Sequence, residues 1–260
     1  MIIAESISHK YRNHPALRGI DIEVKSGEIL GVVGPNGSGK TTLLKILSGV
    51  LKPTSGSVLI NGLNIFSVDS TTRAKVISVV PQNAQIPDEI TVMDAVLAGR
   101  NPHLGLFQWE KESDYKIAEE ALKLARIEDL SSRHVHELSG GERQRMIVAM
   151  ALAQDCRVML LDEPVTSLDI QHQYSVMDLI NTLVNDRMEC AVMSMHDLTL
   201  AGQYCDRLMM LSDGMVLFEG SPKDVLTEDN ILMVYGVNVS VISHPQTGTP
   251  VVMGISGYLG

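Results

Sequence analysis

The sequence is poor in cysteine, in basic residues and in long apolar runs, and each shortage excludes a class of protein. The three cysteines (Cys156, Cys190 and Cys205) form no CxxC pair and lack metal-ligand spacing. We therefore expect reduced thiols, as in a cytoplasmic protein, rather than a disulfide framework. Asp and Glu outnumber Lys and Arg by 31 to 21, and the formal net charge of −10 argues against a broad nucleic-acid-binding surface. Apolar runs such as Ile29–Val33 are far shorter than the roughly 20 residues that a membrane-spanning helix needs.

The beginning of the chain is also unlike a targeting segment. Met1–Tyr11 contains Glu5 and has no long apolar stretch, so we predict that it is not a signal peptide. If the protein works at a membrane, another subunit must hold it there. The apolar content of 45% over 260 residues predicts one large or two closely joined α/β domains with a real core.

Short apolar strands alternate with longer amphipathic segments along the chain. Strands that are continuously apolar and separated by helices indicate a parallel sheet buried on both faces, within a mixed-sheet core. The first two predicted strands alternate instead, which is typical of a half-buried antiparallel β subdomain. The predicted strands are Ile2–Ile7, Ile20–Val24, Ile29–Val33, Ser57–Ile60, Val76–Val80, Val158–Leu161, Ala191–Ser194, Arg207–Leu211 and Met215–Glu219.

A helical insertion and a short C-terminal extension complete the predicted organisation. The strand pattern stops between Asp88 and Leu152, and we predict an inserted helical subdomain over about residues 84–155. Residues 1–236 then form the main domain, and 237–260 form a short β extension with two strands joined by a Pro/Gly turn. The predicted helices are Thr41–Ser48, Thr91–Ala98, Ser113–Ala125, Gly141–Leu152 and Ile170–Arg187.

The segment Gly34-Pro35-Asn36-Gly37-Ser38-Gly39-Lys40-Thr41 fits G-x-x-x-x-G-K-[ST], directly after a strand and before a helix. Glycines let successive backbone N–H groups point at phosphate oxygens, and the helix adds its positive N-terminal end. The motif predicts that Lys40 bridges the β- and γ-phosphates and that the Thr41 hydroxyl ligates Mg²⁺. The alternative, a chance Gly-rich turn, is disfavoured by the strand–turn–helix context.

Two acidic residues, Asp162 and Glu163, follow the apolar strand Val158–Leu161. The carboxyl ends of strands are where α/β sheets bind ligands. Asp162 can reach Mg²⁺ through its water shell, and Glu163 can polarise an attacking water. By themselves these could be two solvated acids that begin a loop, but a phosphate loop in the same chain favours the catalytic interpretation.

The segment Leu138-Ser139-Gly140-Gly141-Glu142 opens a predicted helix, with Ser139 as its N-cap. Adjacent glycines at a positive helix terminus make a second anion site, although the chain already has a phosphate loop. Taken in isolation, the segment is better explained as an ordinary capped helix.

The order of these motifs over nearly the whole chain resembles the nucleotide-binding subunits of ATP-binding cassette (ABC) transporters. LSGGE is similar to the signature of that family, which covers the ATP held by the phosphate loop of the other subunit. The resemblance implies a P-loop NTPase fold, ATP and Mg²⁺ as ligands, and ATP hydrolysis by two chains arranged head to tail. It implies nucleotide contacts from Tyr11, Gly34, Pro35, Asn36, Gly37, Ser38, Gly39, Lys40, Thr41, Thr42, Ser139, Gly140, Gly141 and Asp169.

The resemblance also assigns individual roles. Tyr11 resembles the aromatic residue that stacks on adenine, and Gln82 resembles the glutamine that senses Mg²⁺, the water and the membrane partner. Ser167-Leu168-Asp169 resembles the loop that crosses to the opposite subunit. His196 resembles the histidine that contacts the γ-phosphate and the attacking water. The implied catalytic residues are Glu163, His196, Lys40 and Gln82, and the implied Mg²⁺ ligands are Thr41, Gln82 and Asp162.

Two positions depart from the family pattern: Glu142 replaces a commoner glutamine, and Val165 stands where threonine is frequent. Neither departure removes a catalytic group, so we expect a competent ATPase rather than a non-hydrolysing scaffold. The segment 94–105 and the ending Gly236-Val237…His244-Pro245…Gly248…Pro250 are similar to subunits that drive import of ferric siderophores, haem or cobalamin.

That similarity implies a homodimer at the cytoplasmic face of the membrane, with an integral-membrane permease, an extracytoplasmic substrate-binding protein and no nucleic acid. Import of another substrate such as molybdate stays open, and so does a soluble ABC ATPase of iron–sulfur cluster assembly, which is a single cassette of similar size. The repair-type ATPases are disfavoured because no sustained heptads occur between Thr42 and Leu138.

Overall fold

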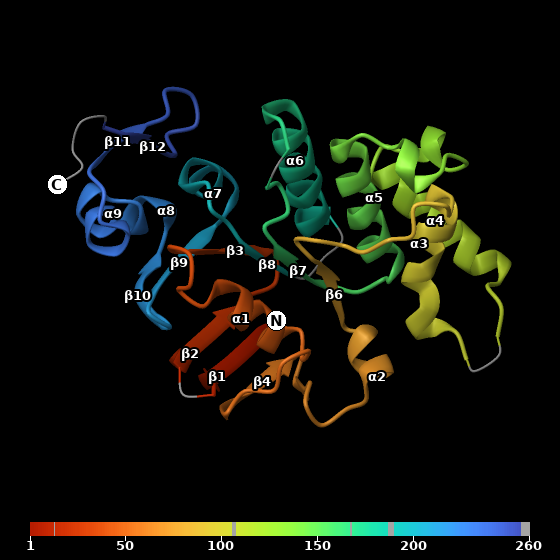
Figure 1. The fold of residues 1–260 in the computed structure, drawn as a ribbon, viewed down its shortest axis with the longest axis horizontal. Coiled ribbons are helices and arrows are strands. Elements are labelled where there is room, and N and C mark those ends of the chain that lie inside the picture. Colours follow the sequence, from red (N-terminus) through yellow and green to blue (C-terminus); the bar gives the residue numbers. More distant parts are fainter. Residues whose placement is uncertain (13, 106–107, 167, 187–189, 256–260) are drawn as a thin grey trace. The chain divides into compact units, whose positions relative to one another are not determined.

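The computed structural model describes the chain except for residues 13, 106–107, 167, 187–189 and 256–260 (Figure 1). The chain divides into two compact units. Residues 1–66 and 189–260 form the first, here called the sheet unit, and residues 67–188 form the second, here called the helical unit. The helical unit contains the predicted helical insertion. It also contains a helix and a strand that precede the insertion in the chain, and a strand and a helix that follow it.

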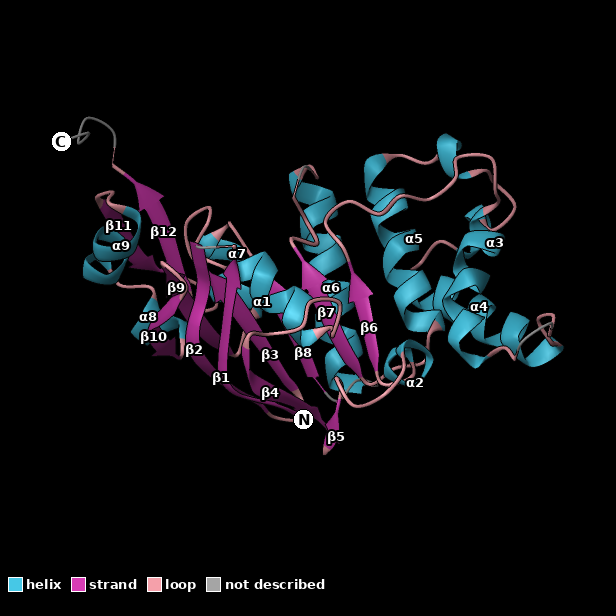
Figure 2. Ribbon diagram, turned by 60° about the horizontal axis from the view of Figure 1, so that its bottom comes forward, coloured by secondary structure: helices cyan, strands magenta, loops and turns pink. Residues whose placement is uncertain are grey.

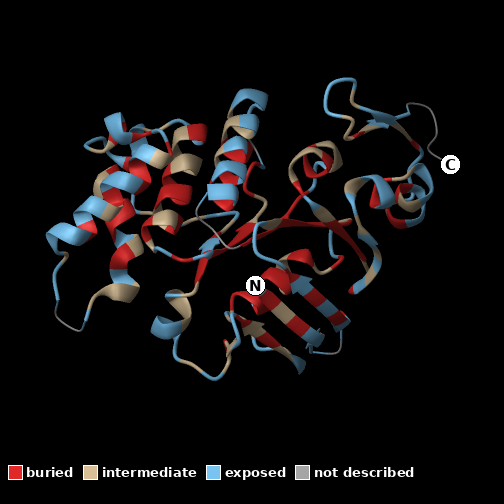
Figure 3. Cartoon of the chain, turned by 180° about the vertical axis from the view of Figure 1, so that it is seen from behind, coloured by how far each residue is buried: buried red, intermediate tan, exposed pale blue. Residues whose placement is uncertain are grey.

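An antiparallel sheet forms one part of the sheet unit. It has the order β2-β1-β4-β5, with β1 (Ile2–Tyr11), β2 (His14–Val24), β4 (Ser55–Ile60) and β5 (Leu63–Asn64). Buried and more exposed residues alternate over Ile2–Ala4 of β1 and Ile20–Val24 of β2, and Figure 3 shows the changes in burial as bands along the strands. The predicted period of two is interrupted between Ala4 and Ile7, where the register shifts, and between Leu17 and Ile20. Both strands extend beyond their predicted limits, β1 to Tyr11 and β2 back to His14. Many of the added residues are polar and show no hydrophobic period, although Leu17 is buried.

The second sheet of this unit places a buried strand at its centre. β3 (Glu28–Val33) runs parallel to β8 (Cys190–Ser194) on one side and to β9 (Arg207–Ser212) on the other. β10 (Met215–Gly220) pairs antiparallel with β9, so the sheet is mixed. Helix α1 (Lys40–Leu47) follows β3 and helix α7 (Leu198–Tyr204) follows β8. Every residue of β3 after its first is buried, as the continuous apolar run predicts.

One glycine of β3 is required by close packing. A Cβ on Gly31 would lie 2.6 Å from Cys205 Sγ and 2.6 Å from a Leu208 methyl carbon. The residues that follow α7 therefore pack directly on the β3 backbone. That contact helps to position the end of β3, where the next turn begins.

The C-terminal part of the sheet unit contains short helices and a hairpin. Helices α8 (Pro222–Val225) and α9 (Glu228–Tyr235) precede β11 (Val239–Ser243) and β12 (Pro250–Gly254), which pair antiparallel. This confirms the predicted two-strand hairpin. Its β12 strand is held by α7, because the Val252 backbone N–H donates to the Thr199 hydroxyl at 3.1 Å. Helices α7, α8 and α9 were not predicted from the sequence.

In the helical unit, two parallel strands lie between helices (Figure 2). They are β6 (Ile77–Val80) and β7 (Val158–Asp162). The helices are α2 (Ser70–Ala74), α3 (Val92–Leu97), α4 (Glu112–Leu124), α5 (Gly140–Ala153) and α6 (Ile170–Asp186), and short 3₁₀ helices span Ala98–His103, Glu128–Leu130 and Val135–Glu137. The four helices predicted in this region are present within two residues of their predicted limits, except at the end of α6, where Arg187 lies outside the described residues.

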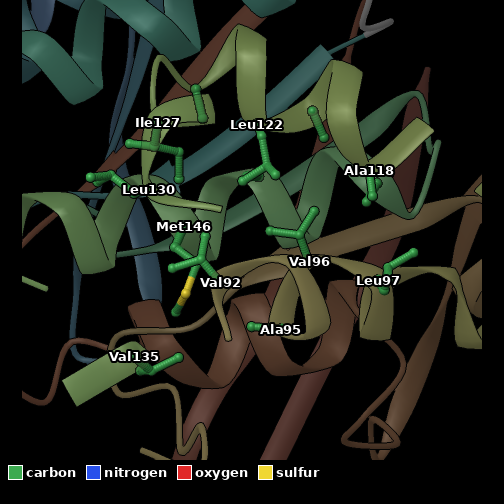
Figure 4. Packing of buried hydrophobic residues seen from close by; sticks show 14 residues of the cluster. Val92, Ala95, Val96, Leu97, Ala118, Leu122, Ile127, Leu130, Val135 and Met146 are labelled. Atoms are coloured by element: carbon green, nitrogen blue, oxygen red, sulfur yellow. The ribbon is translucent and has the colours of Figure 1, made fainter. Parts of the chain in front are cut away.

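A separate apolar core holds α3, α4 and α5 together (Figure 4). Val96, Leu122 and Met146, one from each helix, are at most 1% exposed. A buried ion pair links the 3₁₀ helix Ala98–His103 to α4, because Arg100 Nε lies 3.0 Å from Asp114 Oδ1. Arg100 Nη1 also donates to the carbonyl of Ala153, the last residue of α5, at 2.7 Å. In the part of the chain that the structure describes, no helix combines the length and the apolar content that a bilayer crossing requires.

Candidate functional site

The phosphate loop, Gly34–Thr41, lies at the carboxyl end of β3 and leads directly into α1. Ser38 N donates to the Pro35 carbonyl at 3.2 Å, and Leu43 N donates to the Gly39 carbonyl at 2.8 Å, which starts the helix. Gly34, Gly37 and Gly39 have φ angles of 148°, 82° and 110°. Because L side chains rarely adopt such backbone angles, glycines are needed at these positions for the loop to curl with its N–H groups inward.

Two of these glycines are also needed for space. A Cβ on Gly34 would collide with the Leu211 carbonyl and would lie 2.7 Å from Ser38 Oγ. A Cβ on Gly39 would lie 2.7 Å from a Leu17 methyl carbon. The loop is therefore packed from both sides against the strands of its own unit, so its backbone is positioned before any ligand arrives.

Lys40 is the first residue of α1 and its side chain folds back over the loop. It is only 5% exposed, and its Nζ donates to the Gly34 carbonyl at 2.7 Å and to the Pro35 carbonyl at 3.2 Å. The ammonium group and the positive end of α1 thus concentrate positive charge within the curl of the loop. Thr41, the next residue, is partly buried. This arrangement suits a polyphosphate anion.

His196 and Tyr11 belong to the same unit as the phosphate loop. β8 runs parallel to β3, with Ser194 opposite Val32, and both strands therefore end at the same edge of the sheet. His196 is exposed two residues beyond the end of β8, and Gly34 directly follows the end of β3. Tyr11 is 46% exposed at the end of β1, where its ring meets His9 edge-on with a centroid distance of 4.8 Å.

In the helical unit, the parallel strands β6 and β7 bring two predicted site residues into contact. Val80 is opposite Leu161, so Gln82 and Glu163 both follow strand ends at one edge. Gln82 Nε2 donates to Glu163 Oε2 at 2.5 Å, and the Thr166 hydroxyl donates to the same carboxylate oxygen at 3.2 Å.

Glu163 also has an unusual backbone conformation. Its φ of 53° places a non-glycine residue in the left-handed region, which directs its side chain away from the course that β7 would otherwise give it. Asp162, the last residue of β7, is partly exposed and offers a carboxylate beside it. The strand therefore ends in two acids, and the Gln82 amide holds the second of them, Glu163.

The signature segment, Leu138–Glu142, begins helix α5. The Ser139 hydroxyl accepts from Glu142 N at 3.3 Å, and Glu142 Oε2 accepts from Ser139 N at 2.8 Å, which is a complete capping box. Ser139 is thus the N-cap that the sequence predicts. The Ser139 backbone N–H, together with its hydroxyl, holds the pKa of Glu142 below its ordinary value. Gly140 is exposed at the helix start, so its backbone is open to an anion.

The predicted crossing loop, Ser167–Asp169, ends at the N-terminus of α6; Ser167 lies outside the described residues. Asp169 Oδ1 accepts from His172 N at 2.9 Å and contacts His172 Nδ1 at 2.7 Å. The His172 backbone N–H, together with its ring, lowers the pKa of Asp169. The contacts of His172 and Thr166 and the cap made by Glu142 were not predicted from the sequence. S-x-x-E in the signature segment is a capping-box pattern that could have revealed the last of these.

The chain belongs to the ABC transporter family. The sequence profile of that family, described as ABC transporter, matches residues 17–166. The hemin import ATP-binding protein HmuV of Gloeobacter violaceus is 41% identical, over 97% of this chain and 94% of that protein. The probable siderophore transport ATP-binding protein YusV of Bacillus subtilis is 39% identical, over 96% and 90%. The cobalamin import ATP-binding protein BtuD of Halobacterium salinarum is also 39% identical, and there the chain spans 58% of that protein's length.

Solved structures agree with the sequence relatives. An ABC transporter described as of metal-chelate type, in an inward-facing conformation, matches with a TM-score of 0.85 and 26% identity over 98% of this chain and 96% of that one. A dimeric ATP-binding cassette in a post-hydrolysis state with ADP and phosphate matches with a TM-score of 0.76 and 28% identity over 85% and 99%. The α/β P-loop NTPase cassette fold is thereby confirmed, and the protein is an ATP-binding subunit of the ABC class that hydrolyses ATP.

Proposed function

We propose that this subunit uses ATP hydrolysis to drive import of a metal chelate, of siderophore, haem or cobalamin type, through a separate membrane permease. The observation that carries the proposal is the similarity of nearly the whole chain to import subunits of these three kinds. The C-terminal hairpin also supports the proposal, because the match to the metal-chelate type structure covers 98% of this chain and so extends into the hairpin.

We propose further that two copies of the chain act as a head-to-tail homodimer. Each ATP would lie between Gly34–Thr42 of one chain and Ser139–Gly141 of its partner. The signature segment supports this because its N-cap is satisfied within the chain, by Glu142, while Gly140 stays exposed. A helix start with backbone N–H groups directed outward is suited to a phosphate brought by another molecule. The dimeric relative with ADP and phosphate makes such an assembly the natural one for this fold.

Within each ATP site, the chain's own groups would divide the chemistry. Lys40 would shift from the loop carbonyls to the β- and γ-phosphate oxygens. Glu163, held by Gln82, would orient the attacking water, and His196 would contact the γ-phosphate. Tyr11 would stack on adenine, and Asp169 would contact the partner chain. The side chains of Thr41, Asp162 and Gln82 offer oxygen donors of the kind that Mg²⁺ prefers, and the ion would neutralise charge on the phosphates.

A groove on the helical unit is the surface that we assign to the permease. It has a volume of about 450 Å³ and is lined by the end of β6 and the residues that follow it, by the start of the 3₁₀ helix Ala98–His103 and by α5, among them Pro81, Gln85, Ile86, Gly99, Ile147 and Met150. Because Gln82 lies within this lining segment and donates to Glu163, a partner that moves the segment also moves a hydrogen bond to the catalytic carboxylate. Motion could thereby pass between the site and the membrane.

Isolation of the native complex from membranes tests the proposal. Import predicts a membrane permease as the co-purifying subunit, together with uptake of a metal chelate that depends on that permease and on Glu163. Co-purification with a soluble cluster-assembly partner, without any permease, would contradict it and favour the iron–sulfur alternative. Uptake of molybdate instead of a chelate would keep the transporter assignment and overturn the cargo.

A complementation experiment tests the shared site. A Lys40→Ala chain and a Ser139→Ala chain are each expected to be inactive as homodimers. When they are mixed, the pairing restores one intact site, made of the native phosphate loop of one chain and the native signature of the other. Recovery of ATPase activity on mixing supports the head-to-tail arrangement, and no recovery at any mixing ratio contradicts it.

A further inference from the structure

The imidazole of His172 connects two segments of the helical unit that the proposed dimer uses toward its partner chain. Asp169, at the end of the crossing loop, accepts from His172 N at 2.9 Å and contacts Nδ1 at 2.7 Å through the same oxygen. A carboxylate oxygen can only accept, so Nδ1 of the ring donates to Asp169. The ring is therefore held in one orientation by Asp169.

The other edge of the same ring packs on the signature segment. A Cβ on Gly141 would overlap the imidazole, with Nε2 only 2.6 Å away, so the ring occupies the space that a side chain would need. Gly141 is buried, and the side chain of His172 is 30% exposed. A Cβ on Gly140 would also meet Leu168 Cδ2 at 3.9 Å, which is ordinary contact with the crossing loop. The start of α5 thus rests on the residues around the start of α6.

The contact continues one turn further along both helices. Arg145 Nη2 of α5 donates to the Ser175 hydroxyl of α6 at 2.7 Å. At the other end, the Thr166 hydroxyl donates to Glu163. The catalytic glutamate, the crossing loop and the signature segment are therefore positioned by one set of neighbouring contacts in the helical unit, and His172 is the side chain in that set that touches both Asp169 and Gly141.

We infer that His172 is a positioning residue that joins the crossing loop to the signature segment, so that both segments meet the partner chain as one rigid surface. The inference rests on the proposed head-to-tail function. Without the ring, Asp169 loses its side-chain partner and Gly141 loses the group packed on it, so the two segments are coupled less tightly, although the hydrogen bond from Arg145 to Ser175 remains. Since small displacements at a reacting site lower rates steeply, the loss falls on dimer closure and turnover rather than on nucleotide binding to a single chain.

Three substitutions in the full chain distinguish the contact of His172 with Asp169 from its contact with Gly141. His172→Ala removes both, His172→Phe keeps a ring over Gly141 without the donor, and His172→Asn keeps a donor near Asp169 without the ring. Gln171→Ala is the matched control, because Gln171 is the preceding residue of α6 and is exposed. Each is combined with Glu163→Gln for ATP-dependent dimerisation measured by analytical ultracentrifugation, and studied without it for steady-state ATPase kinetics.

We expect His172→Ala to weaken the ATP-driven dimer and to lower kcat by about tenfold, with the affinity of the monomer for ADP unchanged within twofold. His172→Phe and His172→Asn should each recover part of the loss. If His172→Ala behaves like Gln171→Ala, the inference is wrong. Equal losses of monomer ADP binding and of dimerisation would also overturn it, since they would indicate general destabilisation.

Failure of this inference can be told from failure of the proposed function. If the Glu163→Gln chain with native His172 forms no dimer with ATP, the head-to-tail proposal itself is contradicted. The contact of His172 with the signature segment is then tested in the nucleotide-free chain by amide hydrogen exchange over residues 140–146. We expect exchange there to be about tenfold faster in His172→Ala than in Gln171→Ala. Equal exchange rates in the two variants would show that the ring does not hold the signature segment.

Discussion

Gln82 donates a hydrogen bond of 2.5 Å to the carboxylate of Glu163, although 81 residues separate them in the sequence. The amide reduces the freedom of a side chain whose backbone is already in the left-handed region. Parallel pairing of β6 with β7 places both residues at the same edge, so the contact is a property of the sheet and not of either segment alone. In the proposed mechanism this bond lets a displacement of the permease-facing segment reach the carboxylate that orients water.

Replacing that carboxylate tests its role. Glu163→Gln retains the shape and the contact with Gln82 but removes the charge that orients and polarises water. We expect turnover to fall by about 10²- to 10⁴-fold while ATP still binds, and we expect an ATP-loaded dimer to accumulate. Phosphate release and gel filtration with ATP measure the two effects. Glu119→Gln, on the exposed surface of α4, is the control; turnover near the native rate in the Glu163 variant would contradict the assignment.

Lys40→Ala should abolish the positive group inside the phosphate loop. A hydrogen bond to a charged group contributes about 1.5–3 kcal/mol, so ATP affinity should fall roughly 10- to 100-fold. Titration with a fluorescent ATP analogue measures the change. Lys45→Ala removes an exposed lysine from the same helix and should leave affinity unchanged. Similar losses in the two variants would mean that net charge, not the position of Lys40, governs binding.

The buried ion pair between Arg100 and Asp114 should contribute strongly to the stability of the helical unit. Both side chains are less than 10% exposed, at 7% and 8%. Asp114→Ala leaves the buried guanidinium without its carboxylate, and we expect a loss of about 3 kcal/mol in the free energy of unfolding. Lys116→Ala breaks the exposed pair with Glu112 on the same helix and should cost less than about 0.5 kcal/mol. Denaturant unfolding followed by circular dichroism distinguishes these values, and equal costs would contradict the prediction.

The Asp114 carboxylate should also make the free energy of unfolding depend on pH. The Lys111 backbone N–H and the Arg100 guanidinium hold the pKa of Asp114 below its usual value. A depressed pKa in the folded state means that the unfolded chain takes up the proton first as the pH falls. The contribution of Asp114 is therefore fully present above about pH 5, and it is lost as the pH falls below about 4 toward the folded pKa. The difference in unfolding free energy between the native chain and Asp114→Asn should shrink over that range, and a constant difference would refute the assignment.

The cysteines should be unreactive in the folded protein. Cys156, Cys190 and Cys205 are buried thiols. Burial raises the pKa of the Cys156 thiol to about 12, and burial also raises the pKa of Cys205. Since the thiolate is the reactive species, a disulfide reagent at pH 8 should label the native chain slowly and label all three thiols rapidly after unfolding in guanidinium. Rapid labelling of the native chain would show that these regions open readily.

Much of the fold could be predicted from hydrophobic patterns. The buried run of β3 and the hydrophobic period of α4 are signals carried by each segment alone. Other elements lacked such a signal. Helix α7 has seven residues, and its position depends on contacts with β3 and β12 rather than on its own pattern. The outer ends of β1 and β2 are extended because the two strands pair with each other there.

The candidate site likewise has residues that the sequence predicts and residues that it does not. Lys40 and the glycines of the phosphate loop were predictable because the loop's conformation and charge arise from adjacent residues. The same holds for the Ser139 cap, which bonds three residues ahead. His172 was not predictable, since nothing in residues 167–173 indicates that a ring in α6 packs on a glycine of α5.

The sequence by itself determined the class of chemistry: a curl of glycines that orients N–H groups, a lysine at a helix start, and a capped helix with an exposed glycine. Such features depend on φ angles and on hydrogen bonds between near neighbours, which any segment carries with it. The tertiary structure alone decided which distant groups touch, as Gln82 with Glu163 and His172 with Gly141. Strand pairing and helix packing select those contacts, because they depend on how buried surfaces from different segments fit together.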